Sequence, residues 1–166
     1  RALKNLVSNA VAYSDPAKAR VPEIVLGARR VESRLVIGVY DCGPGISAED
    51  RSRIFGTFYR GAAGRAAPGS GYGLGLSIVR GIARQLGLEL TLGSKPGRGS
   101  VFRLAFSIDE SEQADRFEKA VPIGGEIRAL KGRILLLEDN RFVRDALKSM
   151  LESWGAEVID AGEPCE

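Results

Sequence analysis

The sequence predicts a two-layer α/β sandwich, with helices on one face of a mostly antiparallel mixed sheet, followed by part of a doubly wound parallel α/β unit. Three observations predict this fold class. Two pairs of β-rich segments are joined by short turns, as in hairpins, and two segments carry apolar residues at helical spacing. Near the C-terminus, a continuous apolar run has the pattern of a strand buried on both faces.

The first 60 residues predict a helix, a hairpin and a short second helix. Apolar residues recur at helical spacing from Leu3 to Val11, so an amphipathic helix is already under way at residue 1. Residues 23–31 and 34–40 are rich in β-branched side chains, which predicts two paired strands. Ser47, with an acidic residue three positions later, resembles a capping box and opens a short helix to about residue 54.

The middle of the chain combines a glycine-rich loop with a helix and a second hairpin. Residues 61–71 are small and nearly without apolar anchors, so we expect a mobile loop that acts as a lid. A helical apolar pattern then runs from Leu74 to Leu86. Residues 88–94 and 99–107 follow as strands, joined by a Pro-Gly turn.

The C-terminal part has a different pattern and predicts a separate unit. Residues 109–131 are charged, contain a proline and a glycine pair, and lose strand alternation, so they predict a linker. A buried strand, an amphipathic helix and a second strand follow, which is the beginning of a βαβ unit. The predicted domains are therefore residues 1–108 and 132–166, on either side of this linker.

Composition excludes several classes of function. The chain has 24 Lys and Arg against 21 Asp and Glu, without any block of like charges, so we expect no nucleic-acid binding and no membrane contact by this segment. Two distant cysteines predict neither a disulfide framework nor a metal knuckle, and they fit a cytoplasmic location. No apolar run reaches the roughly 20 residues that cross a bilayer, so a membrane anchor is expected only as an alternative, in another part of the parent protein.

Histidine and a Walker P-loop are both absent from the sequence. Without histidine the chain has no serine-type triad, no imidazole metal site and no phosphohistidine. No GxxxxGK[ST] segment occurs, and the glycine run neither follows a strand nor spells GxGxxG. The usual competing nucleotide-binding motifs are therefore excluded.

Residues 69–80, GSGYGLGLSIVR, place four glycines at alternate positions directly before a helix. Glycine allows positive φ and a close approach to the backbone, while a helix N-terminus presents unpaired N–H groups to anions. The segment therefore predicts a phosphate site. The alternative is a flexible loop before an ordinary helix.

Three polar residues are candidates for ligand binding. Asn5 and Asn9 are four apart on one helix face, and their amide oxygens suit a hard cation such as Mg²⁺; the alternative is a solvated face. Asp41 ends a predicted strand, where its carboxylate can accept a hydrogen bond from an amine. The glycines after it would let a flat ring approach, and the alternative is a plain turn.

Four segments, in this order and at these spacings, resemble the ATP-binding domain of sensor histidine kinases. They are similar to its asparagine box, first glycine box, phenylalanine box and second glycine box, and they read NLVSNAVAYS, DCGPG, RIFGTFYR and GSGYGLGLSIV. The resemblance covers residues 1 to about 108 and identifies this part as a member of the GHKL, or Bergerat-type, ATPase superfamily. It implies ATP and Mg²⁺ as ligands.

The resemblance also implies roles for single residues. Asn9 would help to coordinate the Mg²⁺ on ATP, with Asn5 near the phosphates, and Asp41 would bind the adenine amine. The other implied ATP-site residues are Tyr13, Gly43, Gly45 and Ile46 around the base, Gly71, Gly73 and Gly75 at the phosphates, and Arg60, Tyr72, Leu74 and Leu76 in the same boxes. Phe55 and Phe58 would pack at the base of the lid, a role that ordinary core residues would fit equally well.

Two positions depart from family patterns. The kinases often have a basic residue where this chain has Ala12, so Arg60 or Arg65 would have to supply that charge. Gyrase-like, Hsp90-like and MutL-like ATPases place a glutamate, the general base for water, where this chain has Asn5. Without that carboxylate, phosphoryl transfer to another acceptor is favoured over hydrolysis.

The predicted function is the ATP-binding catalytic region of a hybrid sensor histidine kinase in two-component signalling. Its enzyme class is protein-histidine kinase in the full-length context, with the phosphoacceptor histidine and all catalytic residues outside this chain. The alternatives are a hydrolysing ATPase of the same superfamily and an inactive nucleotide-binding regulatory module. The implied partner is a dimeric helical domain that carries the histidine, upstream in the parent protein.

Residues 132–166 resemble the first strand, first helix and second strand of a response-regulator receiver domain. Glu138 and Asp139 match the acidic pair that binds Mg²⁺ in that family, and the alternative is an acidic helix start after a buried strand. The acceptor aspartate would lie beyond residue 166. A receiver domain or a response regulator is therefore the second implied partner.

Overall fold

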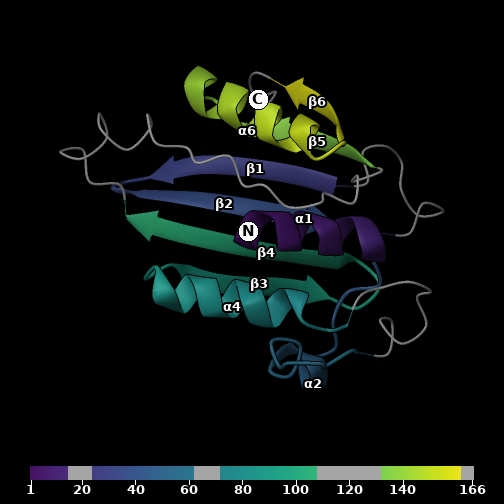
Figure 1. Ribbon diagram of the computed structural model, residues 1–166. Helices are drawn as coiled ribbons and strands as arrows, with labels where there is room; N and C mark the ends of the chain where they lie inside the picture. Colours follow the sequence, from purple (N-terminus) through teal and green to yellow (C-terminus); the bar gives the residue numbers. More distant parts are fainter. Residues whose placement is uncertain (15–23, 62–71, 108–131, 162–166) are drawn as a thin grey trace.

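The computed structural model describes residues 1–14, 24–61, 72–107 and 132–161, and its elements follow the predicted order (Figure 1). The helices are α1 (Ala2–Tyr13), α2 (Ala48–Arg51), α4 (Gly75–Gln85) and α6 (Arg141–Ser153). The strands are β1 (Ile24–Val31), β2 (Arg34–Asp41), β3 (Glu89–Lys95), β4 (Gly99–Ser107), β5 (Arg133–Leu137) and β6 (Glu157–Ala161). The predicted lid, apart from Gly61, and the predicted linker lie outside the described residues.

One mixed sheet contains the six strands in the order β3-β4-β2-β1-β5-β6. The pairs β1–β2, β2–β4 and β3–β4 are antiparallel, whereas β5 runs parallel to β1 and β6 runs parallel to β5. Both predicted hairpins are therefore confirmed. The predicted mixed α/β sheet is confirmed as well.

The pairing of β5 with β1 was not expected from the sequence. Ile24 lies opposite Ile134, and Leu26 lies opposite Leu136, so the C-terminal strands extend the sheet of the N-terminal part. An unpaired edge at β1 would leave a row of backbone N–H and C=O groups without partners, and β5 supplies those partners. The division into two domains at residues 109–131 stays a prediction. The strands on the two sides of this linker belong to one sheet.

The helices cover one face of this sheet. In Figure 1, α1, α4 and α6 lie in front of the strands. Side chains alternate between the two faces of a strand, so Leu26, Val39 and Phe102 point to the helix side together with Leu136. All four belong to one hydrophobic cluster, which includes Leu6 and Val7 of α1, Val79 of α4, and Leu147 and Leu151 of α6. One core therefore underlies all six strands.

Local side-chain chemistry determines where two helices begin. Ser47 Oγ accepts a hydrogen bond from the Asp50 N–H at 3.2 Å, which confirms the predicted cap of α2. The helix ends at Arg51, earlier than predicted, and turns follow it up to residue 55. Asn140 Oδ1 accepts from the first-turn N–H groups of α6. None of the helices that the structure describes is long and apolar enough to cross a bilayer.

Candidate nucleotide-binding site

A cavity of about 360 Å³ lies between α1, the loop after β2, and the turn between β3 and β4. Of the predicted ATP-site residues, those that line it are Asn9, Tyr13, Asp41, Gly45, Ile46, Arg60 and Leu76. The predicted residues that do not line it are Asn5, Gly43, Tyr72, Gly73, Leu74 and Gly75, while Gly71 lies outside the described residues. The fold therefore gathers residues from all four predicted motifs around one space of ligand size.

Asp41 lies at the end of β2, with one carboxylate oxygen held by the protein. Its Oδ1 accepts hydrogen bonds from the Gly43 N–H at 2.9 Å and from the Ser100 N–H at 3.2 Å. Burial raises the pKa of Asp41, and these two backbone donors partly oppose that rise. Both hydrogen bonds go to Oδ1, which leaves Oδ2 available to a ligand in the cavity.

The loop after Asp41 requires glycine at position 45 because it packs closely against the turn between β3 and β4. Gly45 has a φ of 71°, and a Cβ built there would lie 2.2 Å from the Lys95 carbonyl oxygen. The Gly97 N–H also donates to the Pro44 carbonyl at 2.7 Å. The position that a Gly45 side chain would take is therefore filled by the β3–β4 turn, while Gly45 itself lines the cavity.

Asn9 and the first turn of α4 meet at another wall of the cavity. A Cβ built at Gly75 would lie 3.5 Å from Asn9 Oδ1, an ordinary contact distance, so the start of α4 lies directly beside this amide. Leu74 precedes the helix without a capping side chain, and the first turn carries no acidic residue. The N–H groups of that turn are therefore suited to an anion.

The two phenylalanines of the phenylalanine box differ in burial. Phe55 is half-buried and contacts Phe102 edge-on, with ring centroids 6.3 Å apart, which agrees with the predicted packing. Phe58 is 72% exposed and so is not a core residue, while its predicted packing concerns the lid, which lies outside the described residues. Its φ of 61° and the hydrogen bond from its N–H to the Gly73 carbonyl orient it this way. Gly73 itself has a φ of 72°, and a Cβ there would lie 2.8 Å from the Phe58 carbonyl carbon.

Sequence reasoning missed several residues of the cavity wall. Asp50 and Tyr59 line it, and the Tyr59 hydroxyl donates to Asp50 Oδ1. The Arg53 guanidinium lies 4.9 Å from the centre of the Tyr59 ring. Ser100 also lines the cavity and lies directly opposite Asp41. Only the pairing of β2 with β4, which the local pattern does not specify, could have revealed Ser100.

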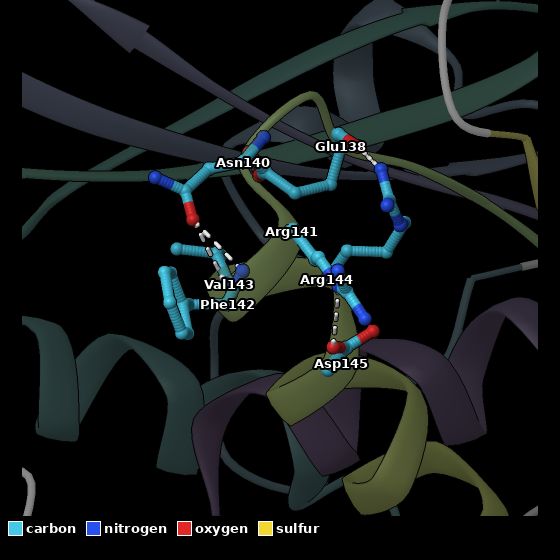
Figure 2. Close-up of polar contacts among 7 residues, drawn as sticks. All are labelled: Glu138, Asn140, Arg141, Phe142, Val143, Arg144 and Asp145. Atoms are coloured by element: carbon cyan, nitrogen blue, oxygen red, sulfur yellow. Dashed lines mark hydrogen bonds and ion pairs between the residues drawn. The ribbon is translucent and has the colours of Figure 1, made fainter.

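The predicted acidic pair follows β5, at a distance in sequence from the motifs around the cavity. Glu138 is 5% exposed, and the Asn140 N–H donates to both Glu138 Oε1 at 2.9 Å and Asp139 Oδ1 at 2.8 Å. Figure 2 shows Arg144 beside this turn, where its side chain donates to the Glu138 carbonyl at 3.0 Å. Burial raises the pKa of Glu138, and the neighbouring Asp139 raises it further.

The role of Glu138 and Asp139 in Mg²⁺ binding stays a prediction, but the structure shows what caps the helix after them. Asn140, not an acidic side chain, caps α6, so Glu138 and Asp139 are not needed as helix caps. Within the described residues, no group of three or more His, Cys, Asp or Glu side chains could hold a metal ion. Two carboxylates therefore form at most part of a cation site here.

Comparison with known proteins connects the sequence to one family. Residues 1–110 match the family model described as histidine kinase-, DNA gyrase B-, and HSP90-like ATPase. Sensor-like histidine kinase SenX3 of Mycobacterium tuberculosis is 43% identical over 104 residues, which are 63% of this chain and 24% of that protein. Sensor histidine kinase AruS of Pseudomonas aeruginosa is 32% identical over 163 residues, which are 96% of this chain and 16% of that protein.

Solved structures show the same fold. The mycobacterial sensor histidine kinase MprB matches with a TM-score of 0.51 at 25% identity, over 64% of this chain and 67% of that one. Full-length ShkA in complex with AMPPNP matches with a TM-score of 0.51 at 24% identity, over 96% of this chain and 30% of that one. The chain spans no more than a quarter of the length of SenX3 and AruS. Because the family model covers more than half of it, the chain belongs to the histidine kinase-, DNA gyrase B- and HSP90-like ATPase family.

Proposed function

We propose that the N-terminal part of this chain is the ATP-binding catalytic region of a hybrid sensor histidine kinase. It would donate the γ-phosphate of Mg-ATP to a histidine on a separate helical domain. One observation carries the proposal: Asp41 of β2 and Asn9 of α1 line the same cavity, beside the uncapped start of α4. A carboxylate, an amide oxygen and a free helix N-terminus suit an adenine amine, Mg²⁺ and phosphate respectively.

In this reaction the chain holds the nucleotide and its partner supplies the nucleophile. Asp41 accepts a hydrogen bond from the adenine amine, and Asn9 helps to hold the Mg²⁺ that accompanies the phosphates. Of the two arginines that could supply the charge missing at Ala12, Arg60 lines the cavity, whereas Arg65 lies outside the described residues. An imidazole nitrogen of the partner attacks the γ-phosphorus in line, a P–N bond forms, and ADP leaves with the electron pair of the broken P–O bond.

The carboxylates around the cavity support transfer over hydrolysis. A hydrolysing ATPase needs a carboxylate that accepts a proton from the attacking water. Asp41 and Asp50 are the acidic residues of the cavity wall as the structure describes it. Asp41 has a base-binding role in this proposal, and Asp50 accepts a hydrogen bond from Tyr59. The helix position that carries a glutamate in the hydrolases is Asn5 in this chain.

The test is calorimetric titration of the whole chain with ATP, ADP and GTP in the presence of Mg²⁺. ATP should bind, ADP should compete with it, and GTP should bind at least about tenfold more weakly, because guanine presents a carbonyl where adenine presents an amine. Equal affinity for GTP would contradict the base assignment. Steady release of inorganic phosphate from bound ATP would favour the hydrolysing ATPase instead.

For residues 132–161, we propose the first part of a receiver domain, with Glu138 and Asp139 as oxygen ligands for Mg²⁺. The carboxyl ends of parallel strands are the usual ligand side of such sheets, and both residues follow the parallel strand β5. Titration with Mg²⁺ should shift the NMR signal of the Asn140 amide, which donates to both carboxylates. The shift should disappear in Asp139→Asn, and the same shift in that variant would contradict the site.

A further inference from the structure

Three residues from neighbouring strands form a row that runs from the cavity into the sheet. Asp41 of β2 lies opposite Ser100 of β4, and Ser100 lies opposite Ser94 of β3. Asp41 and Ser100 line the cavity, whereas Ser94 lies behind them and does not. Ser94 can therefore act on a ligand only through its neighbours.

The hydroxyl of Ser94 makes three contacts, and their chemistry assigns its proton. The Ile46 N–H lies 2.8 Å from Ser94 Oγ and can only donate. The Gly99 carbonyl oxygen lies 3.0 Å away and can only accept, so the single Ser94 proton points to it. Ser94 thereby uses its donor and one of its two acceptor sites.

The third contact then fixes the proton of Ser100. Ser94 Oγ and Ser100 Oγ are 3.1 Å apart, and geometry alone allows either oxygen to be the donor. The Ser94 proton is already given to Gly99, so the proton between the two hydroxyls comes from Ser100. The second acceptor site of Ser94 is filled by this bond, and its hydroxyl is fully satisfied.

Toward the cavity, Ser100 Oγ can therefore accept a hydrogen bond but cannot donate one. Ser100 is 9% exposed, and its N–H donates to Asp41 Oδ1. Asp41, when ionised, also offers only acceptors. At this end of the cavity the wall consequently presents two neighbouring acceptors, which match the amino group of a 6-aminopurine. A 6-oxopurine would bring its own acceptor against them.

We propose that Ser94 is a specificity-determining residue for the nucleotide base, although it does not touch the cavity. Its oxygen accepts the hydrogen bond of the Ser100 hydroxyl. Ser100 Oγ therefore remains an acceptor toward the cavity, and the site discriminates against 6-oxopurine nucleotides. The inference rests on the proposed function, since it concerns the nucleotide bound in the same cavity. Ser94 also holds Ile46, a cavity residue, so its loss has a general effect on binding and a base-specific one.

The experiment separates these two effects by comparing Mg-ATP with Mg-ITP, because inosine and adenosine nucleotides differ only in the group at position 6 and the proton at N1. In Ser94→Ala the Ser100 hydroxyl loses its hydrogen-bond acceptor. Its O–H can then rotate into the cavity and act as a donor. We expect the preference for ATP over ITP, measured as a ratio of dissociation constants, to fall about three- to tenfold, the range of one neutral hydrogen bond. Weaker binding from the loosened Ile46 loop affects both nucleotides and cancels in the ratio.

Matched variants test the route through Ser100. Ser94→Thr keeps the hydroxyl and should keep the wild-type ratio. Ser100→Ala removes the acceptor, so ATP should bind more weakly while ITP does not, and adding Ser94→Ala to it should change the ratio no further. An unchanged ratio in Ser94→Ala would overturn the role of Ser94. If Ser94→Ala does not fold, an unchanged ratio in Ser100→Ala would overturn it. Failure of the wild-type chain to bind ATP at all would instead overturn the proposed function, and this inference with it.

Discussion

Incubated with Mg-ATP alone, the chain should form no phosphohistidine, whereas a separately supplied helical domain with a phosphorylatable histidine should become labelled. The family reaction needs an imidazole nitrogen in line with the γ-phosphate, and the sequence contains no histidine. Asp41, Asn9 and the start of α4 can hold the nucleotide, but they provide no acceptor. The measurement uses radiolabelled ATP, followed by a test for acid-labile label on each polypeptide.

Two controls make this experiment decisive. Replacing the histidine of the supplied domain by alanine should abolish its labelling, because the nucleophile is then missing. Acid-labile label on the chain alone would contradict the mechanism. Measured ATP binding without transfer to the domain from the same parent protein would favour the inactive regulatory module.

Replacement of Asp41 by Asn should weaken ATP binding by about ten- to a hundredfold, the value of one charge-assisted hydrogen bond. The carboxylate accepts from the adenine amine, and the amide of the variant would place a donor or a weaker neutral acceptor there. Calorimetric titration measures the change. Asp145→Asn, on the exposed surface of α6, is the matched control and should leave ATP affinity unchanged.

The same substitution should not destabilise the protein without nucleotide. Burial raises the pKa of Asp41, which means that folding favours the protonated form over the charged one. Above the pKa that Asp41 has in the folded protein, its charged carboxylate therefore lowers the free energy of unfolding. This loss of stability disappears as the pH falls through that pKa. Chemical denaturation should show an equal or higher free energy of unfolding for Asp41→Asn at neutral pH. A clear loss of stability would show that the two backbone donors, not burial, dominate at Asp41.

The pH dependence of binding should run in the opposite direction to that of stability. ATP needs the ionised carboxylate, so affinity should fall as Asp41 is protonated at acidic pH. The nucleotide phosphates also titrate, and Asp41→Asn reports their contribution because it lacks the carboxylate. The difference between the two pH profiles should therefore show the titration of Asp41 alone. Parallel profiles would contradict its role as an ionised acceptor.

Local patterns predicted the secondary-structure elements correctly, and they pointed to Asn9 and Asp41, which both line the cavity. Helical spacing marked α1 and α4, β-branched runs marked β1 and β2, and Ser47 marked the cap of α2. These features depend on residues within a few positions of one another, so the sequence states them directly. Asn9 and Asp41 were found for the same reason, since each stands at a recognisable place in a helix or after a strand.

Contacts between distant segments could not be predicted in this way. The aromatic residue Phe58 has an apolar side chain like that of Phe55, yet the turn around it leaves it exposed. Ser94 and Ser100 look like ordinary strand residues until β2, β4 and β3 are placed side by side. Asp50 and Tyr59 likewise meet only when the chain after α2 turns back on itself.

The sequence by itself determined the secondary-structure elements, the lack of a histidine acceptor and the residue types available for a nucleotide, because these follow from local spacing and composition. Only the tertiary structure decided that β5 pairs with β1, that Asn9 lies beside the start of α4, and that the Ser94 hydroxyl lies 3.1 Å from that of Ser100. The physical reason is that strand partners and hydrogen-bond directions depend on which distant backbones come together. Backbone groups at a strand edge are alike in every strand, so register and burial select their partners.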